Sequence, residues 1–565
     1  MSTTVKSKKS NRLVPKLFAV RKDLTKAQLI KDLVSGVIVA IIALPLSIAL
    51  ALASGVNPEQ GLYTAIVAGF LVSFFGGSRV QIAGPTAAFA TIVAGIVASD
   101  GMSGLIIATI LAGIMLVLMG VFKLGTLIKY IPGTITEGFT FGIAVTILVG
   151  QIKDFLGLTF EHAPVETIEK IEEVIHCIGT FNPTALIVGV IALAILIFWP
   201  KKLQKIPASL IAVIVTAALV KLADLNVNTI GDLYTISSAP PKFSAPDFSL
   251  DIVKAQLPNA VTIAVLAAVE SLLSCVVSDA MIGSKHNSNM ELIAQGIANI
   301  GSSLFGGIPA TGAIARTAAN INNGGRTPIA GMVHAVVVLL ILVLLMPYAA
   351  LIPMPTIAAI LFIVAYNMSG WRGIVKTIKT APKSDVIVLV TTLTLTVVFD
   401  LVVAICVGMV LAALLFMKRM ADVTEAREFK EPDENDPEHI RFRRIPKDTK
   451  VFEINGPMFF AAANKFNYAV HKSDFKVLCI RMRNVMAIDA AGIESISHMI
   501  ESCKKHNIRI IFSHVNEQPL KAMTHAGIVD TVGAESFRAN IDEALAYASE
   551  LTEGKKVLSD SKDNS

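Results

Sequence analysis

The sequence has 565 residues, of which 53% are hydrophobic and only 16% charged, and its mean hydropathy is +0.66. Soluble domains carry roughly 25% charged residues, so this composition excludes a chain that is soluble throughout. The net charge of +6 does not indicate nucleic-acid binding, because the basic residues are distributed over loops between apolar segments instead of gathering in one groove. The five cysteines imply no disulfide framework.

Apolar runs begin after a basic amino-terminal segment, residues 1–32, which is expected to be cytoplasmic. This segment lacks a short apolar core followed by a small-residue cleavage site, so a cleaved signal peptide is not expected. From there to Met417 such runs recur at about 17 to 25 residues, long enough to cross the hydrocarbon core of a bilayer. We predict a transmembrane domain of residues 33–419 with about fourteen spans. These are 33–54, 60–77, 82–98, 103–122, 133–152, 184–199, 207–222, 259–281, 291–306, 310–322, 328–346, 349–368, 384–399 and 400–417.

The charge of each loop predicts the side of the membrane on which it lies. Lys and Arg accumulate in short cytoplasmic loops, and every second loop of this chain is basic, whereas the loop from about Thr159 to Asn182 is acidic. We therefore expect a multi-pass protein of the plasma (inner) membrane with both termini in the cytoplasm.

Two of the predicted spans are interrupted. The third contains Pro85, and the approach to the tenth contains Pro309, each with glycine close by and small residues following. Proline removes a backbone donor and clashes with the preceding turn, so each break predicts an extended stretch and then a short helix, starting near Thr86 and near Thr311. Irregular backbone at membrane depth is tolerated only where it is buried in protein or lines a wet cavity.

The two breaks also match each other. Phe74-Phe75-Gly76-Gly77 precedes the first much as Leu304-Phe305-Gly306-Gly307 precedes the second, seven spans later. Seven is odd, so the two halves are predicted to run in opposite directions through the membrane. Either break taken singly is as easily a packing feature, but matched interruptions in two inverted halves indicate the binding site of a transporter.

The predicted site favours an anion. Two helix amino termini meeting at the midplane present unpaired backbone amides and two positive dipole ends, the threonine hydroxyls can donate, and Arg316 adds a forked positive charge. The predicted substrate-binding residues are Thr86, Ala87, Ala88, Ala310, Thr311, Gly312, Ala313 and Arg316.

Glu270 lies near the centre of the eighth span, where an unpaired carboxylate costs several kcal/mol. It can carry a coupling proton, bind Na⁺ together with Ser274 one turn later, or simply neutralise Arg316. No metal site or cofactor is expected apart from a coupling H⁺ or Na⁺.

At these residues the chain resembles the SulP family of anion transporters. The resemblance extends from about Lys31 to the end of the chain. Its motifs are Ala43-Leu44-Pro45-Leu46-Ser47-Ile48-Ala49, Gly61-Leu62-Tyr63, Gly84-Pro85-Thr86-Ala87, Glu270-Ser271-Leu272-Leu273 and Thr311-Gly312-Ala313-Ile314-Ala315-Arg316. It implies a polytopic α-helical 7+7 inverted repeat like that of the uracil transporters, a mobile core and a gate domain, elevator-type alternating access, and a homodimer.

Within the family, Gly77-Ser78-Arg79, the segment 152–158 and the segment 285–292 look most similar to bacterial C4-dicarboxylate members. The first hypothesis is therefore a secondary active transporter of succinate, fumarate or aspartate coupled to H⁺. The alternatives are a sulfate or bicarbonate transporter coupled to H⁺ or Na⁺, and an uncoupled anion channel, which has no need of a titratable group such as Glu270 beside its site.

After a linker, residues 420–447, the tail changes to an α/β pattern. Strands are predicted at 450–454, 477–482 and 509–513 with helices between them. Residues 448–550 resemble the STAS domain through Gly456-Pro457-Met458-Phe459-Phe460, Ile488-Asp489-Ala490-Ala491-Gly492 and Gln518-Pro519-Leu520. In related soluble proteins a phosphorylated Ser or Thr follows that Asp, whereas Ala490 follows it here. We expect this domain to bind a cytoplasmic regulatory protein or to serve folding alone, and residues 551–565 to be disordered.

Other classes are disfavoured. A nucleobase transporter of the same fold would need side-chain acceptors for ring amides, and Arg316 suits an oxyanion or a carboxylate better. The sequence contains no H-E-x-x-H, G-x-S-x-G or Walker-type motif, so neither an enzyme nor an ATP-driven pump is predicted.

Overall fold

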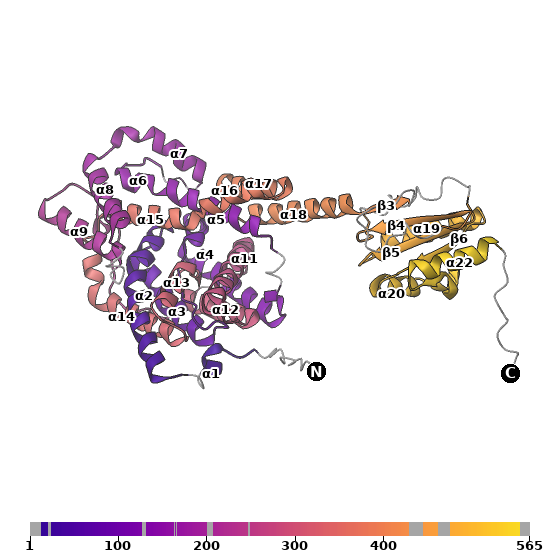
Figure 1. The fold of residues 1–565 in the computed structure, drawn as a ribbon. Helices are drawn as coiled ribbons and strands as arrows, with labels where there is room; N and C mark the ends of the chain where they lie inside the picture. The colour runs from indigo at the N-terminus through magenta and orange to yellow at the C-terminus, as the bar shows by residue number, and fades with distance from the viewer. Residues whose placement is uncertain are drawn as a thin grey trace. The chain divides into compact units, whose positions relative to one another are not determined.

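The computed structural model describes residues 13–20, 24–126, 131–162, 164, 166–200, 207–246, 249–399, 401–428, 445–460 and 475–553. The chain divides into two compact units, Met1–Met409 and Val410–Ser565, which are called here the membrane unit and the carboxy-terminal unit. Each is described by itself (Figure 1).

The membrane unit is almost entirely helical. Its elements in chain order, including the helix that continues past residue 409, are α1 (Lys16–Val20), α2 (Lys26–Ala53), α3 (Pro58–Phe75), β1 (Ala83–Gly84), α4 (Ala87–Val121), α5 (Gly133–Gly150), α6 (Ile152–Leu156), α7 (Thr167–His176), η3 (Ile178–Thr180), α8 (Pro183–Phe198), α9 (Ala208–Leu222), α10 (Ile230–Leu233), α11 (Leu250–Ile282), α12 (Ser288–Leu304), β2 (Thr311–Gly312), α13 (Ile314–Asn322), α14 (Ile329–Ala349), α15 (Met354–Ser369), α16 (Trp371–Thr380), α17 (Lys383–Val398) and α18 (Leu401–Val423).

The predicted polytopic helical fold is confirmed. A helix lies in each of the fourteen predicted spans, and the third and fourth share α4, which changes direction at Gly101, a glycine with φ 65°. Within the described residues, 7 helical segments are long and apolar enough to cross a membrane, when α5 is counted together with α6 and α15 together with α16. The other predicted spans hold shorter or more polar helices, of which α13 is the shortest with 9 residues.

The helices of the membrane unit pack in two groups. In the core group, α12 packs against α3 and α4, α11 against α4, and α14 against α2 and α3. In the gate group, α5 packs against α15 and α17, and α15 packs against α8. Figure 1 shows the two groups in different parts of the unit. The predicted core and gate are therefore distinct layers of packing.

Close helix packing makes the core group a tight body. A Cβ atom built on Gly296 of α12 would lie 2.4 Å from the carbonyl oxygen of Gly113 of α4, and one on Gly113 would lie 2.7 Å from that of Gly296. Only glycine permits this approach of two backbones, which is a common device in membrane helices. The first half of the chain is thus joined directly to the second.

The two interrupted spans meet through their backbones. β1 and β2 pair as antiparallel strands, with Ala83 opposite Gly312 and Gly84 opposite Thr311. Because the strands pair, the helices that follow them, α4 and α13, begin close together. The inverted arrangement predicted from the matched breaks is what brings the two strands together in antiparallel order.

A buried carboxylate binds the segment that precedes β1. Glu291, at the start of α12, is fully buried. One of its oxygens accepts hydrogen bonds from the backbone N–H groups of Gly77 (2.8 Å) and Ser78 (3.0 Å), and the other accepts from the side-chain amides of Gln81 and Gln295, both at 3.1 Å. All four partners are donors, so only an acceptor with two oxygens satisfies this site.

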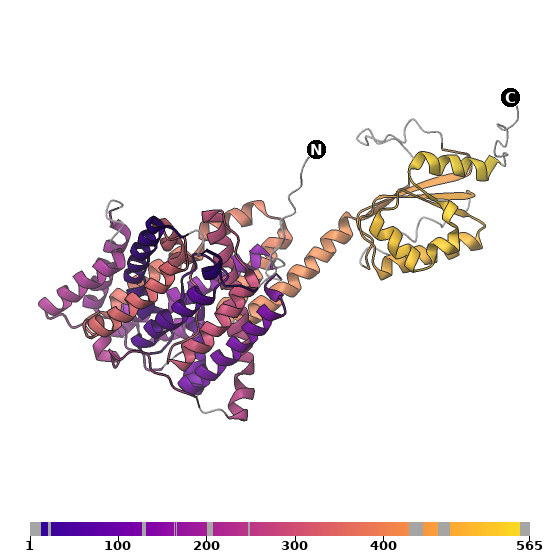
Figure 2. The same ribbon diagram turned by 90° about the horizontal axis from the view of Figure 1, so that it is seen from below.

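The carboxy-terminal unit contains a five-stranded sheet with the order β3 (Glu425–Glu428), β4 (Thr449–Asn455), β5 (Val477–Asn484), β6 (Arg509–Ser513), β7 (Phe537–Arg538). β3 is antiparallel to β4, and the other pairs are parallel. The helical elements are α19 (Ala490–Lys505), α20 (Glu517–His525), α21 (Ile528–Val532), η7 (Ala534–Ser536) and α22 (Ile541–Glu553). Figure 2 shows the sheet between helices on both faces.

Each face of this sheet has its own apolar core. Ile480 and Met482 face α19 and α20, while Val477 and Cys479 face α22. Burial raises the pKa of the Cys479 and Cys503 thiols to about 12, so both side chains are neutral packing residues. β4, β5 and β6 lie where strands are predicted.

The observed elements cross several of the predicted domain limits. α2 begins inside the predicted amino-terminal segment 1–32, and α18 and β3 both enter the predicted linker 420–447. β3 pairs with β4, so the sheet includes residues that precede position 448. The predicted disordered tail, residues 551–565, lies mostly outside the described residues, and α22 extends to Glu553.

We predict that Glu291→Gln lowers the stability of the folded protein by roughly 1–3 kcal/mol, because the amide nitrogen of Gln would face donors and leave buried N–H groups unpaired. Thermal unfolding of the purified protein measures the effect. Glu172→Gln, at an exposed position of α7, is the matched control. Equal melting temperatures for the two variants would contradict this role of Glu291.

Candidate functional site

The predicted site residues come together at the β1–β2 junction. Ala310, Thr311 and Gly312 are buried on one side of it, and Ala87 and Ala88, in the first turn of α4, are 5% and 3% exposed on the other. Ala313, which precedes α13, is 8% exposed. All but Arg316 and the threonines are small, so a ligand at the junction approaches backbone directly.

Neither helix that starts at the junction is capped by a side chain. The residues at the capping positions are Thr86 for α4 and Ala313 for α13, and neither provides a hydrogen bond to the first turn. The unpaired N–H groups of a first turn carry partial positive charge. Two such helix ends therefore form a ready site for an anion.

The hydroxyl of Thr86 bonds a side chain of another span and not the first turn of α4. Oγ1 of Thr86 donates to Oε2 of Glu270 at 2.9 Å. This bond joins the third span to the eighth and places the carboxylate beside the start of α4. Glu270 is partly exposed, in contrast to the buried residues around it on α11.

Thr311 does not occupy the position that the sequence predicts. The second half-helix begins at Ile314, because Thr311 and Gly312 are extended and pair with β1. The hydroxyl of Thr311 is fully buried and donates to the carbonyl oxygen of Ala267 at 3.1 Å. Its proton and that of Thr86 are both engaged by the protein, so neither hydroxyl is a free donor for a ligand.

Arg316 lies in the first turn of α13 and is only 1% exposed. Its Nη2 donates to the carbonyl oxygen of Pro85, in the opposite break. Its Nε and Nη1 find no hydrogen-bond partner among the described residues. A buried guanidinium with unpaired donors is unfavourable, and an oxyanion at the junction would satisfy it.

A direct pair between Glu270 and Arg316 is not found, since the described part of the chain contains no ion pair between them. Ser274, the proposed sodium partner of Glu270, is fully buried, and its Oγ has no hydrogen-bond partner among the residues described.

Sequence reasoning missed the polar residues behind the junction. Gln81, 4% exposed, donates to Oγ of Ser271 at 3.1 Å, and the same Oγ accepts from the backbone N–H of Gly312 at 3.2 Å. Asn299 bonds both backbone groups of Ala310 at 2.9 Å. The signal that could have found them is the presence of glutamine and asparagine among apolar residues.

A cavity of about 300 Å³ lies next to the site, and Ala88 is the predicted substrate-binding residue that lines it. It starts at Ala88 on α4 and ends beside Glu166 and Thr167, in the loop predicted to be external. Its walls come from α4 and α11 of the core group and from α5 and α17 of the gate group. The cavity therefore lies along the boundary between the two groups.

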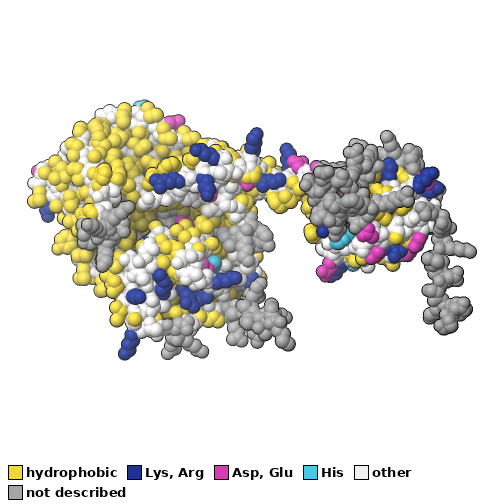
Figure 3. All heavy atoms as spheres, in the orientation of Figure 1, with side chains coloured by type: hydrophobic (Ala, Val, Ile, Leu, Met, Phe, Trp, Pro, Cys, Tyr) yellow, Lys and Arg dark blue, Asp and Glu magenta, His cyan; other side chains and the backbone are white. Residues whose placement is uncertain are grey.

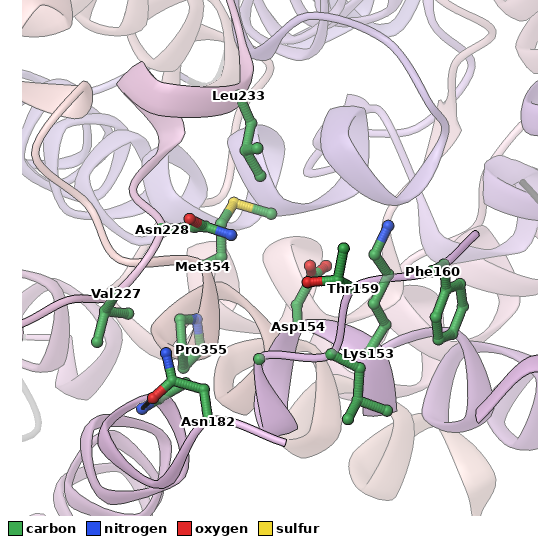
Figure 4. Close-up of a pocket in the computed structure, with 13 residues that line it drawn as sticks. Lys153, Asp154, Thr159, Phe160, Asn182, Val227, Asn228, Leu233, Met354 and Pro355 are labelled. Atoms are coloured by element: carbon green, nitrogen blue, oxygen red, sulfur yellow. Dashed lines mark hydrogen bonds between the residues drawn. The ribbon is translucent and has the colours of Figure 1, made fainter. Parts of the chain in front are cut away.

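A second cavity, of about 170 Å³, lies within the gate group (Figure 4). Asp154 and Thr159 point into it, and Nζ of Lys153 lies 4.9 Å from the ring centre of Phe160. None of the predicted substrate-binding residues lines it. Four residues of segment 152–158 line this cavity: Lys153, Asp154, Gly157 and Leu158. This part of the C4-dicarboxylate resemblance therefore lies away from the junction.

Paired half-helices in two inverted halves, with uncapped amino termini and a buried arginine, define a membrane transport protein for small anions. The described residues include no cluster of three or more His, Cys, Asp or Glu side chains that would hold a metal ion.

Comparison with known proteins identifies the family. The model of the sulfate permease family matches residues 29–392, and that of the STAS domain matches residues 441–544. The chain belongs to the sulfate permease family and carries a carboxy-terminal STAS domain, as the sequence motifs imply.

Relatives match most of the chain. The Bacillus subtilis protein named "Putative sulfate transporter YvdB" is 39% identical over 520 residues, which are 91% of this chain and 96% of that protein. The bicarbonate transporter BicA of Picosynechococcus is 30% identical over 453 residues, or 76% of this chain and 79% of its own. The inward-facing structure of the murine anion transporter Slc26a9 has the same fold, with a TM-score of 0.84, 19% identity, and coverage of 95% of this chain and 94% of that one.

We predict that Gly84→Ala weakens anion binding by roughly tenfold or more, the loss expected when a charged hydrogen-bond donor is displaced. Gly84 has φ 156°, and a Cβ there would lie 2.4 Å from Nη1 of Arg316, so the guanidinium must move. Titration calorimetry with sulfate and bicarbonate measures the change. Gly150→Ala, where the added Cβ meets nothing within 4 Å, is the control, and equal affinities in the two variants would refute the prediction.

Proposed function

We propose that this protein is a secondary active transporter of a small oxyanion, sulfate or bicarbonate, which binds at the β1–β2 junction. The observation that best supports this proposal is the buried guanidinium of Arg316. Its Nε and Nη1 are unpaired among the described residues and lie beside two uncapped helix ends. A tetrahedral or planar oxyanion accepts from several directions at once and suits this arrangement of donors.

The relatives favour sulfate or bicarbonate over the C4-dicarboxylates that the sequence motifs put first. The relatives reported above are named for sulfate and for bicarbonate. The segments that carried the dicarboxylate likeness lie elsewhere. Segment 152–158 is in the gate group. The other two segments, 77–79 and 285–292, meet behind the junction, where the backbone N–H of Ser78 donates to Glu291. These segments therefore give no information on the ligand.

The proposed mechanism is elevator-type alternating access. The core group includes α4, and the second half-helix α13 packs against α2 and α11 of the same group. The packing of this group includes backbone-to-backbone contact. The cavity next to the site lies between this group and the gate group. A displacement of the core as one body would move the junction across the membrane without breaking the β1–β2 pair.

Glu270 is the proposed coupling residue, with H⁺ as the coupling ion. Its carboxylate accepts from Thr86, which directly precedes α4, so a change in its protonation changes the hydrogen bonding at the anion site. Proton uptake at Glu270 together with anion binding keeps the buried charge near balance. An uncoupled channel would not need this group.

The wider arrangement is proposed from the sequence and the family. The protein is placed in the plasma (inner) membrane as a homodimer, with both termini in the cytoplasm. The STAS domain is proposed to dock a cytoplasmic regulatory protein. Asp489 caps α19 by accepting from the backbone N–H of Gly492, and its other oxygen accepts from the backbone N–H of Phe460. The first residue of α19 is Ala490, which has no hydroxyl, so phosphorylation at that position is not part of the proposal.

Uptake into proteoliposomes tests the function. We expect labelled sulfate or bicarbonate to accumulate when an inward proton gradient is imposed, and Arg316→Ala to reduce initial uptake at least roughly tenfold, since it removes the charged donors. Labelled succinate is measured in parallel. Accumulation of succinate alone would restore the dicarboxylate hypothesis, and anion flux without accumulation under any H⁺ or Na⁺ gradient would indicate a channel.

We predict that Glu270→Gln abolishes the dependence of uptake on the proton gradient and changes anion affinity by less than about threefold, because Gln keeps an acceptor for Thr86 and removes the titrating group. Uptake with and without the gradient, together with calorimetric affinity, separates the two effects. Glu161→Gln, at an exposed loop position, should behave as wild type. Retained proton dependence in Glu270→Gln would remove Glu270 from coupling.

A further inference from the structure

The short helix α16 was not predicted, because the loop between the twelfth and thirteenth spans was recognised only by its charge. α15 ends at Ser369, Gly370 follows in a left-handed conformation with φ 56°, and α16 runs from Trp371 to Thr380. The glycine separates α16 from the apolar helix before it. α16 is therefore an independent element that links two membrane helices of the gate group.

One side of α16 is fixed to the protein. Ile374 is 6% exposed, and Oγ1 of Thr377 donates to Oε2 of Glu137 on α5 at 2.9 Å. Residues three apart lie on the same side of a helix, so Ile374 and Thr377 together define the side that faces α5.

The next side of α16 is apolar and uncovered. Trp371, Val375 and Ile378 are spaced by four and three residues, so they share one side, and they are 42%, 41% and 47% exposed. Tryptophan is enriched where membrane meets water, since its ring is amphipathic. This row of side chains suits the boundary between acyl chains and headgroups.

A basic side adjoins the apolar one. Arg372, Lys376 and Lys379 are again spaced by four and three residues and are exposed. They form no ion pair with any described residue, and the guanidinium carbon of Arg372 lies 5.3 Å from the centre of the Trp371 ring. Figure 3 shows Lys and Arg atoms gathered where Figure 1 places α16.

We propose that α16 lies in the interface of the bilayer and binds the headgroups of anionic phospholipids through Arg372, Lys376 and Lys379. An apolar side next to a basic side is the pattern of a helix lying in the membrane plane, and basic residues next to membrane helices attract anionic lipids. The acidic segment 431–438 of the linker would neutralise the charges but would leave the apolar side in water. A phospholipid satisfies both sides, and its binding holds the gate group to the membrane.

The chain offers a direct probe, because it contains only two tryptophans, Trp199 and Trp371. In Trp199→Phe, Trp371 is the sole tryptophan and reports on α16. The full-length variant is reconstituted in phosphatidylcholine vesicles containing brominated phosphatidylglycerol or brominated phosphatidylcholine. We expect both lipids to quench Trp371, the anionic one with an apparent affinity at least about fivefold higher, the factor expected from one basic residue near an anionic surface.

A charge variant and salt test the contacts. In the Trp199→Phe background, R372Q/K376Q/K379Q should bring the two apparent affinities to about the same value, whereas K504Q/K505Q/K521Q, which neutralises three exposed lysines of the STAS domain, should keep the difference. With α16 unchanged, high salt should remove the preference for the anionic lipid, because ions at about 1 M screen charges beyond roughly 3 Å.

Two results would overturn the proposal. No quenching by either lipid would mean that α16 lies outside the bilayer, as it would if the acidic segment 431–438 bound it instead. Equal quenching by both lipids in the unmutated α16 would mean that it enters the bilayer without recognising headgroup charge. Neither result would bear on the transport function, which is measured separately by anion uptake.

Discussion

The antiparallel pair of β1 and β2 is the contact on which the membrane unit depends. It involves only two residues from each half, yet it brings two helix amino termini together inside the apolar part of the protein. Unpaired backbone at that depth is costly, so the polar side chains around the junction are needed for its stability. Gln81, Ser271, Asn299 and Glu291 form this support. Their bonds leave the first turns of α4 and α13 free for a ligand.

The same support explains why the glycines at the junction matter. A Cβ on Gly312 would lie 1.9 Å from Nε2 of Gln81, and one on Gly84 would collide with Arg316. A side chain at position 312 would displace Gln81, which supports the junction, and a side chain at position 84 would displace Arg316, which belongs to the anion site. Small residues here are thus required both by the protein and by a ligand that approaches its backbone.

Much of this fold is predictable from single residues. Pro85 and Pro309 mark the breaks, their separation by seven spans gives the inverted relation, and Glu270 stands out as a carboxylate in an apolar span. The pairing of the breaks as strands is not predictable in this way, because it depends on contact between distant segments. For that reason the predicted helix start near Thr311 is wrong, and the structure begins α13 at Ile314.

Side-chain partners were the least predictable part. Thr86 and Thr311 look like ligand donors by position, but both hydroxyl protons are taken by acceptors on α11. Arg316 reaches across the junction to Pro85, which its distance along α13 does not indicate. α16 escaped prediction because a loop between spans was judged by its charge, although the spacing of Trp371, Val375 and Ile378 shows its periodicity.

The junction also constrains how the protein is made. Arg316 and Pro85, which bond each other, are 231 residues apart in the chain. At a synthesis rate of about 5–20 residues per second, the first break exists for roughly ten to fifty seconds before its partner emerges from the ribosome. During that time the third span has an open strand edge and no carboxylate for Gly77 and Ser78. The nascent first half therefore has to be held in a protected environment at the translocon until the second half arrives.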